Sequence, residues 1–189
     1  MHLSRDVLKS LILSDNLLAN FADLDAQLTA NGVDVRLAAI VEILEGGRLG
    51  AQKSDNRPPL LGNAVVLAGF ESRLDGYAVK MKHVVDQATV KLKPLQPYLV
   101  VTCEELNTPS HLMTHIAART SLFRLAQSGL FCTFGEAGYK GFLTFMLLPF
   151  AQSEIDLGAR FAQLTFSELK GAANYADQKE ASYQGGKLF

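Results

Sequence analysis

The sequence predicts an all-β fold of many short strands, with one short helix near the N-terminus. Between residues 64 and 166, runs rich in β-branched and aromatic residues recur at short intervals, and turn-forming residues separate them. Long helical patterns do not alternate with these runs, which disfavours a doubly wound sheet and favours a sandwich, a jelly roll or a barrel. At 189 residues, the chain has the length of one domain with a sizeable core.

The elements are predicted as follows. Leu3, Val7, Leu8, Leu11 and Ile12 recur at helical spacing, with Ser4 placed to cap the start of the helix. Residues 33–37 alternate as a half-buried strand does. Further strands are predicted over residues 64–67, 77–81, 88–92, 98–102, 141–148 and 160–166. A second short helix is predicted over residues 119–128, with Gly129 as its C-terminal cap.

Residues 46–63 collect glycine, proline and charged residues, which predicts a long loop. Loops of this length are often functional or disordered. The chain has no internal repeat, no low-complexity tract and no shift in composition along its length. We therefore expect a single domain over residues 1–189, with residues 175–189 as a C-terminal flap.

Composition narrows the classes of function. Hydrophobic residues make up 48% and charged residues 20%, and the formal net charge of −1 offers no basic surface for nucleic acid. Cys103 and Cys132 form no CxxC motif, which argues against a zinc site and a disulfide framework and favours buried thiols. The N-terminus lacks a signal-peptide pattern, and no stretch approaches the roughly 20 apolar residues of a membrane span, so we expect a cytoplasmic protein.

The segment RTSLFRL over residues 119–125 is the most informative motif. Arg119, Thr120, Ser121 and Arg124 place two guanidiniums and two hydroxyls at the start of a short helix. Free backbone N–H groups together with arginine forks suit a phosphate group. The alternative for this segment is an ordinary solvated helix face.

Two further segments carry polar groups among apolar or glycine neighbours. In GEAGYKG, residues 135–141, Glu136 and Tyr139 offer a carboxylate and an aromatic face where glycines permit close approach of a ligand; the alternative is a plain β-turn. In GARFAQLTF, residues 158–166, Gln163 shares a strand face with Phe161 and Thr165 and can read a base edge or bond to backbone. The glycine-rich, cationic tail over residues 181–187 is either a fraying end or a flap.

In this order and spacing, the segments resemble the dCTP deaminase / dUTP diphosphatase superfamily. The opening LSRDVLKSLI and residues 31–37, NGVDVRL, are similar to the first segments of that superfamily, and the similarity is weakest over residues 46–87. The resemblance implies a homotrimer of distorted jelly-roll, or β-clip, subunits. It also implies active sites built between neighbouring chains and a pyrimidine deoxynucleoside triphosphate as the substrate.

The resemblance also implies roles for individual residues. Arg119, Thr120, Ser121 and Arg124 would hold the phosphates and help to order the catalytic water, and Tyr139 would pack beneath the deoxyribose. Asp34 would support a hydrated Mg²⁺ on the triphosphate. Gln163 would lie beside the site. The C-terminal flap would include Tyr175, Tyr183 and Gln184.

Two departures from the deaminase pattern bear on the reaction. Deaminases place a catalytic glutamate where Met146 stands, and a thioether cannot act as the general base that makes hydroxide from water. They also place a lysine where Ser182 stands. The diphosphatases have an aspartate where Glu136 stands. The extra methylene of the glutamate moves the carboxylate by more than about 1 Å, a misplacement that costs about 10²-fold in rate unless the backbone shifts.

On these grounds we predict a Mg²⁺-dependent diphosphatase that converts dUTP, or a related nucleotide, to the monophosphate and pyrophosphate. In this interpretation Glu136 is the catalytic base, and the arginines stabilise charge on the phosphate oxygens. One alternative is a dCTP deaminase in which another group, such as Glu136, serves the cytosine. A second alternative is a nucleotide-binding trimer without catalysis. His111 and His115, four residues apart, lack an evident third metal ligand, so we assign them a structural or solvent-facing role.

Overall fold

The computed structural model describes residues 1–132, 134–179, 181 and 183–187, and it confirms the all-β prediction. The strands are β1 (Leu18–Ala19), β2 (Val33–Glu45), β3 (Leu60–Leu67), β4 (Met81–Val85), β5 (Thr89–Leu92), β6 (Tyr98–Asn107), β7 (Leu112–Ala118), β8 (Ser128–Phe131), β9 (Phe134–Gly135), β10 (Lys140–Pro149), β11 (Ser153–Asp156) and β12 (Arg160–Glu168). The α-helices are α1 (Arg5–Asp15), α2 (Leu24–Gln27) and α3 (Thr120–Leu125). The 3₁₀ turns are η1 (Lys53–Asp55), η2 (Glu71–Leu74), η3 (Tyr175–Asp177) and η4 (Gln184–Gly186).

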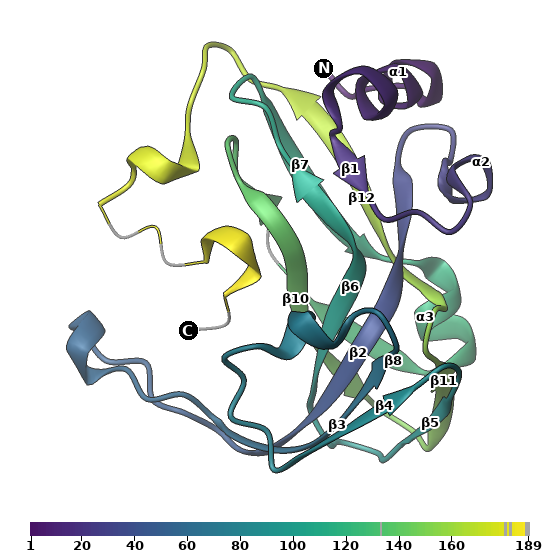
Figure 1. Cartoon of the computed structure of the whole chain (residues 1–189), viewed down its shortest axis with the longest axis vertical. Coiled ribbons are helices and arrows are strands. Elements are labelled where there is room, and N and C mark those ends of the chain that lie inside the picture. Colours follow the sequence, from purple (N-terminus) through teal and green to yellow (C-terminus); the bar gives the residue numbers. More distant parts are fainter. Residues whose placement is uncertain (133, 180, 182, 188–189) are drawn as a thin grey trace.

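Strand β2 is the centre of a curled sheet (Figure 1). The main path runs β8-β10-β6-β2-β12-β7-β9, β3 also pairs with β2, and β5 and β11 form a separate two-stranded sheet. The start of β2 pairs with β12, where Asp34 faces Gln163, and its later part pairs with β6 and β3. Because β2 has neighbours along both edges, residues 33–41 are almost all buried, in place of the half-buried alternation that the sequence predicts.

The N-terminal helix is confirmed as α1, which begins after Ser4 in an extended conformation. The Ser4 side chain makes no capping hydrogen bond. Leu8 and Ile12 turn inward and join a core that contains Leu37, Phe161 and Phe166. Full burial of one such side chain contributes about 1.5–3 kcal/mol, so this core is the main support for the sheet that carries the polar residues.

Two predicted boundaries are wrong for local reasons. Residues 77–80 lie outside any strand and β4 begins at Met81, because the chain turns at Gly76 (φ 82°) and buries Tyr77, whose hydroxyl lies 2.9 Å from the Thr144 hydroxyl. The second helix ends at Leu125 and not at residue 128, because Gln127 takes up a left-handed conformation (φ 47°). The expected cap, Gly129, is instead part of strand β8, which pairs with β10.

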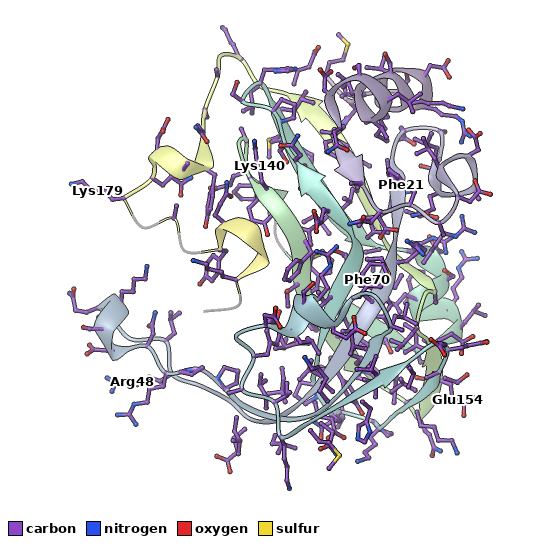
Figure 2. All side chains as sticks on the ribbon, viewed as in Figure 1. Phe21, Arg48, Phe70, Lys140, Glu154 and Lys179 are labelled. Carbon is purple, nitrogen blue, oxygen red and sulfur yellow. The ribbon has the colours of Figure 1, made fainter. Side chains whose placement is uncertain are left out.

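The predicted loop over residues 46–63 is a projecting arm followed by a strand. Strand β3 already begins at Leu60, which pairs with Glu45, and the intervening residues are exposed or nearly so. Arg48 and Arg57 form an antiparallel bridge that holds the two sides of the arm together. Figure 2 shows Arg48 on this arm, away from the body of the molecule.

Strand β7 is an element that the sequence patterns did not indicate. Its residues alternate only weakly in polarity, yet β7 pairs with β12 over seven positions, from Ala118 opposite Ala162 to Leu112 opposite Glu168. His115 therefore lies on a strand and contacts His2, with ring centroids 5.8 Å apart, while His111 precedes the strand. Within the part of the chain that is described, no helix is long and apolar enough to cross a membrane.

Candidate functional site

The predicted site residues fall into two groups that one chain does not bring together. Asp34, Gln163 and the α3 residues lie around the junction of β2, β12 and α3. Glu136, Tyr139 and the tail lie along β10 and the C-terminal turns, on the other side of the molecule (Figure 1). The first group forms an ion cluster and the second lines a cavity.

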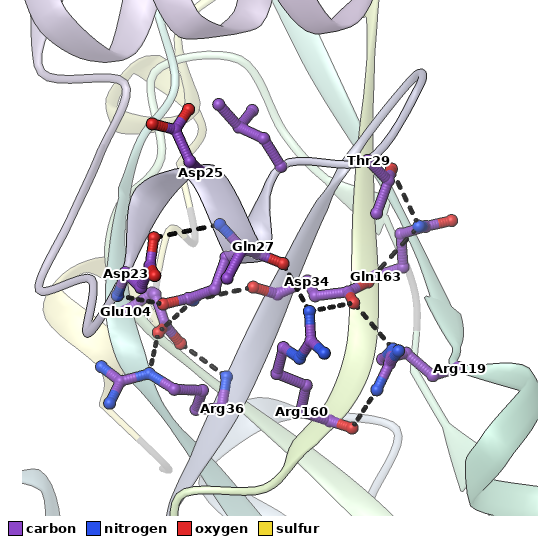
Figure 3. Close-up of polar contacts among 12 residues, drawn as sticks. Asp23, Asp25, Gln27, Thr29, Asp34, Arg36, Glu104, Arg119, Arg160 and Gln163 are labelled. Atoms are coloured by element: carbon purple, nitrogen blue, oxygen red, sulfur yellow. Dashed lines mark hydrogen bonds and ion pairs between the residues drawn. The ribbon is translucent and has the colours of Figure 1, made fainter.

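The ion cluster is centred on Asp34, which is 2% exposed (Figure 3). Its Oδ2 accepts from Arg119 Nε at 2.8 Å, and Arg160 Nη1 lies 3.6 Å away. Arg119 also donates from Nη1 to the Arg160 carbonyl at 3.0 Å. Arg160 lies in the segment GARFAQLTF, but the sequence predicted no role for it. The pairing of β12 with β2 brings Arg160 to Asp34.

Gln163 completes the cluster and lies outside the cavity. Its Nε2 donates to the Thr29 hydroxyl at 3.1 Å and lies 3.4 Å from Asp34 Oδ1. Burial raises the pKa of Asp34, and the charges of Arg119 and Arg160 offset this effect only in part. The Asp34 carboxylate is thus a buried anion whose oxygens already face donors.

This arrangement does not fit a cation at Asp34. Both carboxylate oxygens are directed at nitrogen donors, and two guanidiniums repel a divalent ion. Among the described residues, no group of three or more histidine, cysteine, aspartate or glutamate side chains is arranged to hold a metal. No catalytic step is therefore assigned to Mg²⁺, and the requirement of the protein for this ion stays a prediction.

Helix α3 presents the remaining phosphate candidates at the surface. Thr120 and Arg124 are exposed and Ser121 is half-buried, while Leu122 anchors the helix in the core. The Arg124 guanidinium lies 5.9 Å from the Phe123 ring and has no acidic partner within the described chain. Arg124 is therefore free to bind an anion, whereas Arg119 is already paired with Asp34.

The second group lines a cavity of about 650 Å³ between β10, β9 and the C-terminal turns. One wall is apolar and includes Leu99, Ile116, Phe131, Phe145 and Met146. The polar lining residues include Glu136, Thr144, Gln178 and Lys187. A largely apolar cavity of this size with a few polar groups is typical of a small-molecule site.

Glu136 and Met146 line this same cavity. Glu136 is half-buried, and its Oε2 accepts one hydrogen bond from Gln178 Nε2 at 2.7 Å. Met146 pairs across the sheet with Phe131 and with Leu99, so its thioether belongs to the apolar wall. Among the described lining residues, Glu136 is the one carboxylate.

Tyr139 and Tyr175 form an aromatic corner of the cavity. Their ring centroids are 5.8 Å apart at an interplanar angle of 70°, and both side chains are buried. Tyr139 donates from its hydroxyl to the Phe142 carbonyl at 2.7 Å, and burial raises its pKa, so the phenol stays protonated. This corner presents ring surface to a ligand.

The predicted flap residues lie against the cavity of their own chain. Tyr183 donates from its backbone N–H to the Tyr175 hydroxyl at 3.0 Å. The Gln184 side chain bridges the turn before β10, because it accepts from Lys140 N at 3.1 Å and donates to the Gly138 carbonyl at 3.2 Å. Ser182, the position at which deaminases carry a lysine, lies outside the described residues.

Two further ion pairs, each with one buried side chain, were not anticipated. Glu104 is 2% exposed and accepts from Arg36 Nε and from Gln27 Nε2, both at 2.8 Å, which ties α2 to β2 and β6 (Figure 3). Arg73, which is buried, pairs with Glu105, which is partly exposed. Both glutamates stand in the printed segment CEEL, but nothing in a single sequence indicates which arginine reaches a given carboxylate.

Comparison with known proteins decides the family. A family model described as dCTP deaminase-like matches residues 2–169. The chain belongs to this family. It is 30% identical to the dCTP deaminase of Haloarcula marismortui, over 95% of this chain and 87% of that relative. It is 32% identical to the dCTP deaminase of Thermococcus kodakarensis over 127 residues, or 64% of this chain and 79% of the relative.

A solved structure supports the fold. The 2′-deoxycytidine 5′-triphosphate deaminase of Agrobacterium tumefaciens matches with a TM-score of 0.58 at 18% identity, and the match covers 93% of this chain. The chain spans about half of that protein, because the match covers 49% of its length. The curled β fold predicted from the resemblance is therefore confirmed.

These comparisons correct the predicted reaction. The relatives named above are dCTP deaminases, so the diphosphatase interpretation is wrong and its deaminase alternative is favoured. The prediction gave Met146, which stands where deaminases place a glutamate, more weight than the alternative in which Glu136 serves the cytosine. Because Glu136 lines the same cavity, a methionine at position 146 does not leave the cavity without a carboxylate.

Proposed function

We propose that this chain deaminates dCTP to dUTP and ammonia. In this reaction the oxygen of a water molecule bonds to C4 of the cytosine, the bond from C4 to the amino nitrogen breaks, and ammonia leaves. A general base must take a proton from the water and return it to the departing nitrogen. Membership of the dCTP deaminase-like family and the similarity to two archaeal dCTP deaminases support the proposal.

The position of Glu136 is the observation that carries the proposal. Its carboxylate lines the cavity that Met146 also lines. Among the described residues, it accepts one hydrogen bond, from Gln178, which leaves oxygen lone pairs for a water molecule. Tyr139 and Tyr175 offer ring surface for the sugar, and the Thr144 hydroxyl offers a polar contact. In this role Glu136 shuttles the proton that the glutamate of other family members moves.

We further propose that two copies of the chain complete each site in a trimer. Within one chain, the cavity lacks an arginine among its described lining residues, whereas Arg124 on α3 is exposed and without an acidic partner there. A triphosphate in the cavity needs cationic groups. Thr120, Ser121 and Arg124 of a neighbouring copy would supply the phosphate contacts, beside Arg119, which is paired with Asp34.

The test is a product assay on the purified protein with dCTP, with and without Mg²⁺, in which ammonia and pyrophosphate are measured separately. We expect ammonia without pyrophosphate, and Glu136→Gln should lower ammonia release by about 10²–10⁴-fold, the usual worth of a general base. Asp156→Asn, an exposed carboxylate on β11, is the matched control and should leave the rate unchanged.

Three results would contradict the proposal. Ammonia release that Glu136→Gln does not alter would remove Glu136 from catalysis while leaving deamination in place. Pyrophosphate release in place of ammonia would show that the chain cleaves the triphosphate and does not deaminate the base. Binding of dCTP without either product would make the chain a nucleotide-binding member of the family that lacks catalysis.

A further inference from the structure

We propose that Arg73 is a positioning residue that fixes the Phe142 ring at the wall of the cavity, and that Phe142 in turn holds the C-terminal segment, residues 183–187, at the edge of the cavity, an arrangement that we call the latch. Arg73 lies on η2, within the stretch where the resemblance to the superfamily is weakest. The latch is a property of the fold, and its effect on catalysis rests on the proposed deamination of dCTP.

Arg73 is buried in an unusual way. It is 6% exposed, and its guanidinium pairs with Glu105 and donates from Nη2 to the Cys103 carbonyl at 2.9 Å. The Nε–H of Arg73 has no hydrogen-bond partner in the described part of the chain. A buried polar group without a partner is destabilising, so hydrogen bonding alone does not account for the burial of Arg73.

Contacts between the guanidinium and two aromatic rings account better for the burial of Arg73. Arg73 Cζ lies 4.8 Å from the centroid of the Phe142 ring and 5.7 Å from that of Phe70, both within cation–π range. Phe142 stands opposite Glu105 in the pairing of β10 with β6, next to a register shift before Thr144. Arg73 thus binds both members of one cross-strand pair where the ladder is irregular, and it holds the Phe142 ring in place.

The Phe142 ring lines the cavity and also supports the tail. Gly186 packs so closely on this ring that a methyl group there would lie 2.7 Å from three ring atoms. Gly141, next to Phe142, is equally close to the tail, since a methyl group there would lie 2.6 Å from Gly186 N. Two glycines therefore allow the tail backbone to lie directly on β10.

The contacts from Arg73 to Phe142 and from Phe142 to Gly186 hold the tail residues that border the cavity. Gly186 and Lys187 both line it, and Gln184 is bonded to the turn before β10. If Phe142 were free to rotate, Gly186 would lose its support and the tail would leave the cavity edge. The segment over residues 183–187 is thus coupled to Arg73 through one aromatic ring.

A pair of glycine substitutions tests the latch without reference to catalysis. Gly185 and Gly186 have nearly the same backbone conformation, with φ of 78° and 80°, so alanine is equally strained at either position. Only Gly186→Ala meets the Phe142 ring, because a methyl group on Gly185 would have no atom of the described residues within 4 Å. We expect limited trypsin digestion, followed by mass spectrometry, to show faster cleavage after Lys179 in Gly186→Ala than in Gly185→Ala.

Arg73→Met removes the contact between Arg73 and the Phe142 ring. It should speed cleavage after Lys179 by about 2- to 30-fold, which corresponds to the free energy of one cation–π contact. Arg73→Lys keeps the charge and should fall between Arg73→Met and the unchanged protein. Equal cleavage of the two glycine variants would overturn the latch. If Arg73→Met fails to fold, the glycine pair still decides this point.

The kinetic consequence is a separate readout. We expect Arg73→Met and Gly186→Ala to raise KM for dCTP in the ammonia assay by a similar factor, with a smaller effect on kcat. A residue that serves only stability would lower the melting temperature without moving KM. If the protein releases no ammonia at all, the proposed function fails while the digestion experiment still decides the latch.

Discussion

The two polar regions of this protein use carboxylates in opposite ways. At the ion cluster, Asp34 is 2% exposed and faces Arg119, Arg160 and Gln163. At the cavity, Glu136 is half-buried and accepts one hydrogen bond from an amide. A carboxylate whose oxygens all face donors stabilises structure, whereas one with open lone pairs can move a proton. The difference supports the proposal that deamination takes place in the cavity and that the ion cluster has a structural role.

The largest expected effect concerns the carboxylate of the cavity. In a Glu136→Gln background, Met146→Glu should restore ammonia release, because it returns a base to the same cavity. The rate of ammonia release should rise by up to about 10²–10⁴-fold, the usual contribution of a general base, or by about 10²-fold if the new carboxylate is imperfectly placed. Met146→Gln in the same background has nearly the same shape and no charge, so it should restore nothing.

The next effect is on stability at the ion cluster. Asp34→Ala leaves Arg119 and Arg160 without their shared carboxylate and should lower the free energy of unfolding by about 3 kcal/mol, the low end for breaking a buried pair. The low end applies because both arginine side chains keep some solvent contact. Urea denaturation measures this change.

Asp25→Ala is the control for that experiment. Asp25 pairs with Lys9 at 2.6 Å on the surface, where its side chain is 67% exposed. Exposed ion pairs contribute little, so unfolding should be unchanged within error. An equal loss in both variants would show that burial does not distinguish the two sites.

A smaller effect should appear at the thiols. Cys132 lines the cavity and is half-buried, whereas Cys103 is fully buried and its pKa is raised to about 12 by burial. A thiol reagent should therefore modify Cys132 first. A dCTP concentration ten times its Kd should slow that modification about tenfold if nucleotide fills the cavity. Cys132→Ser identifies the reactive residue, and modification that dCTP does not slow would place the nucleotide elsewhere.

The smallest effect is a dependence of stability on pH. Burial raises the pKa of Asp34 above its ordinary value of 3.8, so the folded state binds the proton more tightly than the unfolded state. The stability from this group is fully present below the ordinary pKa and is lost as pH rises through the folded value. Unfolding measured from about pH 4 to 7 should show the unchanged protein losing stability relative to Asp34→Asn. The opposite slope would mean that the arginines outweigh burial.

The sequence alone determined the elements that depend on local pattern. Helix α1 follows from apolar residues at helical spacing, and β10 and β12 follow from runs of β-branched and aromatic residues with turn residues at their ends. Motif order was enough to indicate the family, because RTSLFRL, GEAGYKG and GARFAQLTF keep their spacing. Strand β7 was missed because its weak alternation becomes a strand only through pairing with β12.

The tertiary structure decided which side chains meet. Glu136 and Met146 line one cavity, which spacing along the chain could not show. Asp34 acquires its arginines from α3 and β12, and Arg73 reaches Phe142 from η2. Pattern along a chain reports burial and periodicity, which are local, whereas pairing between distant charges depends on strand register. That register is set by the packing of the whole sheet.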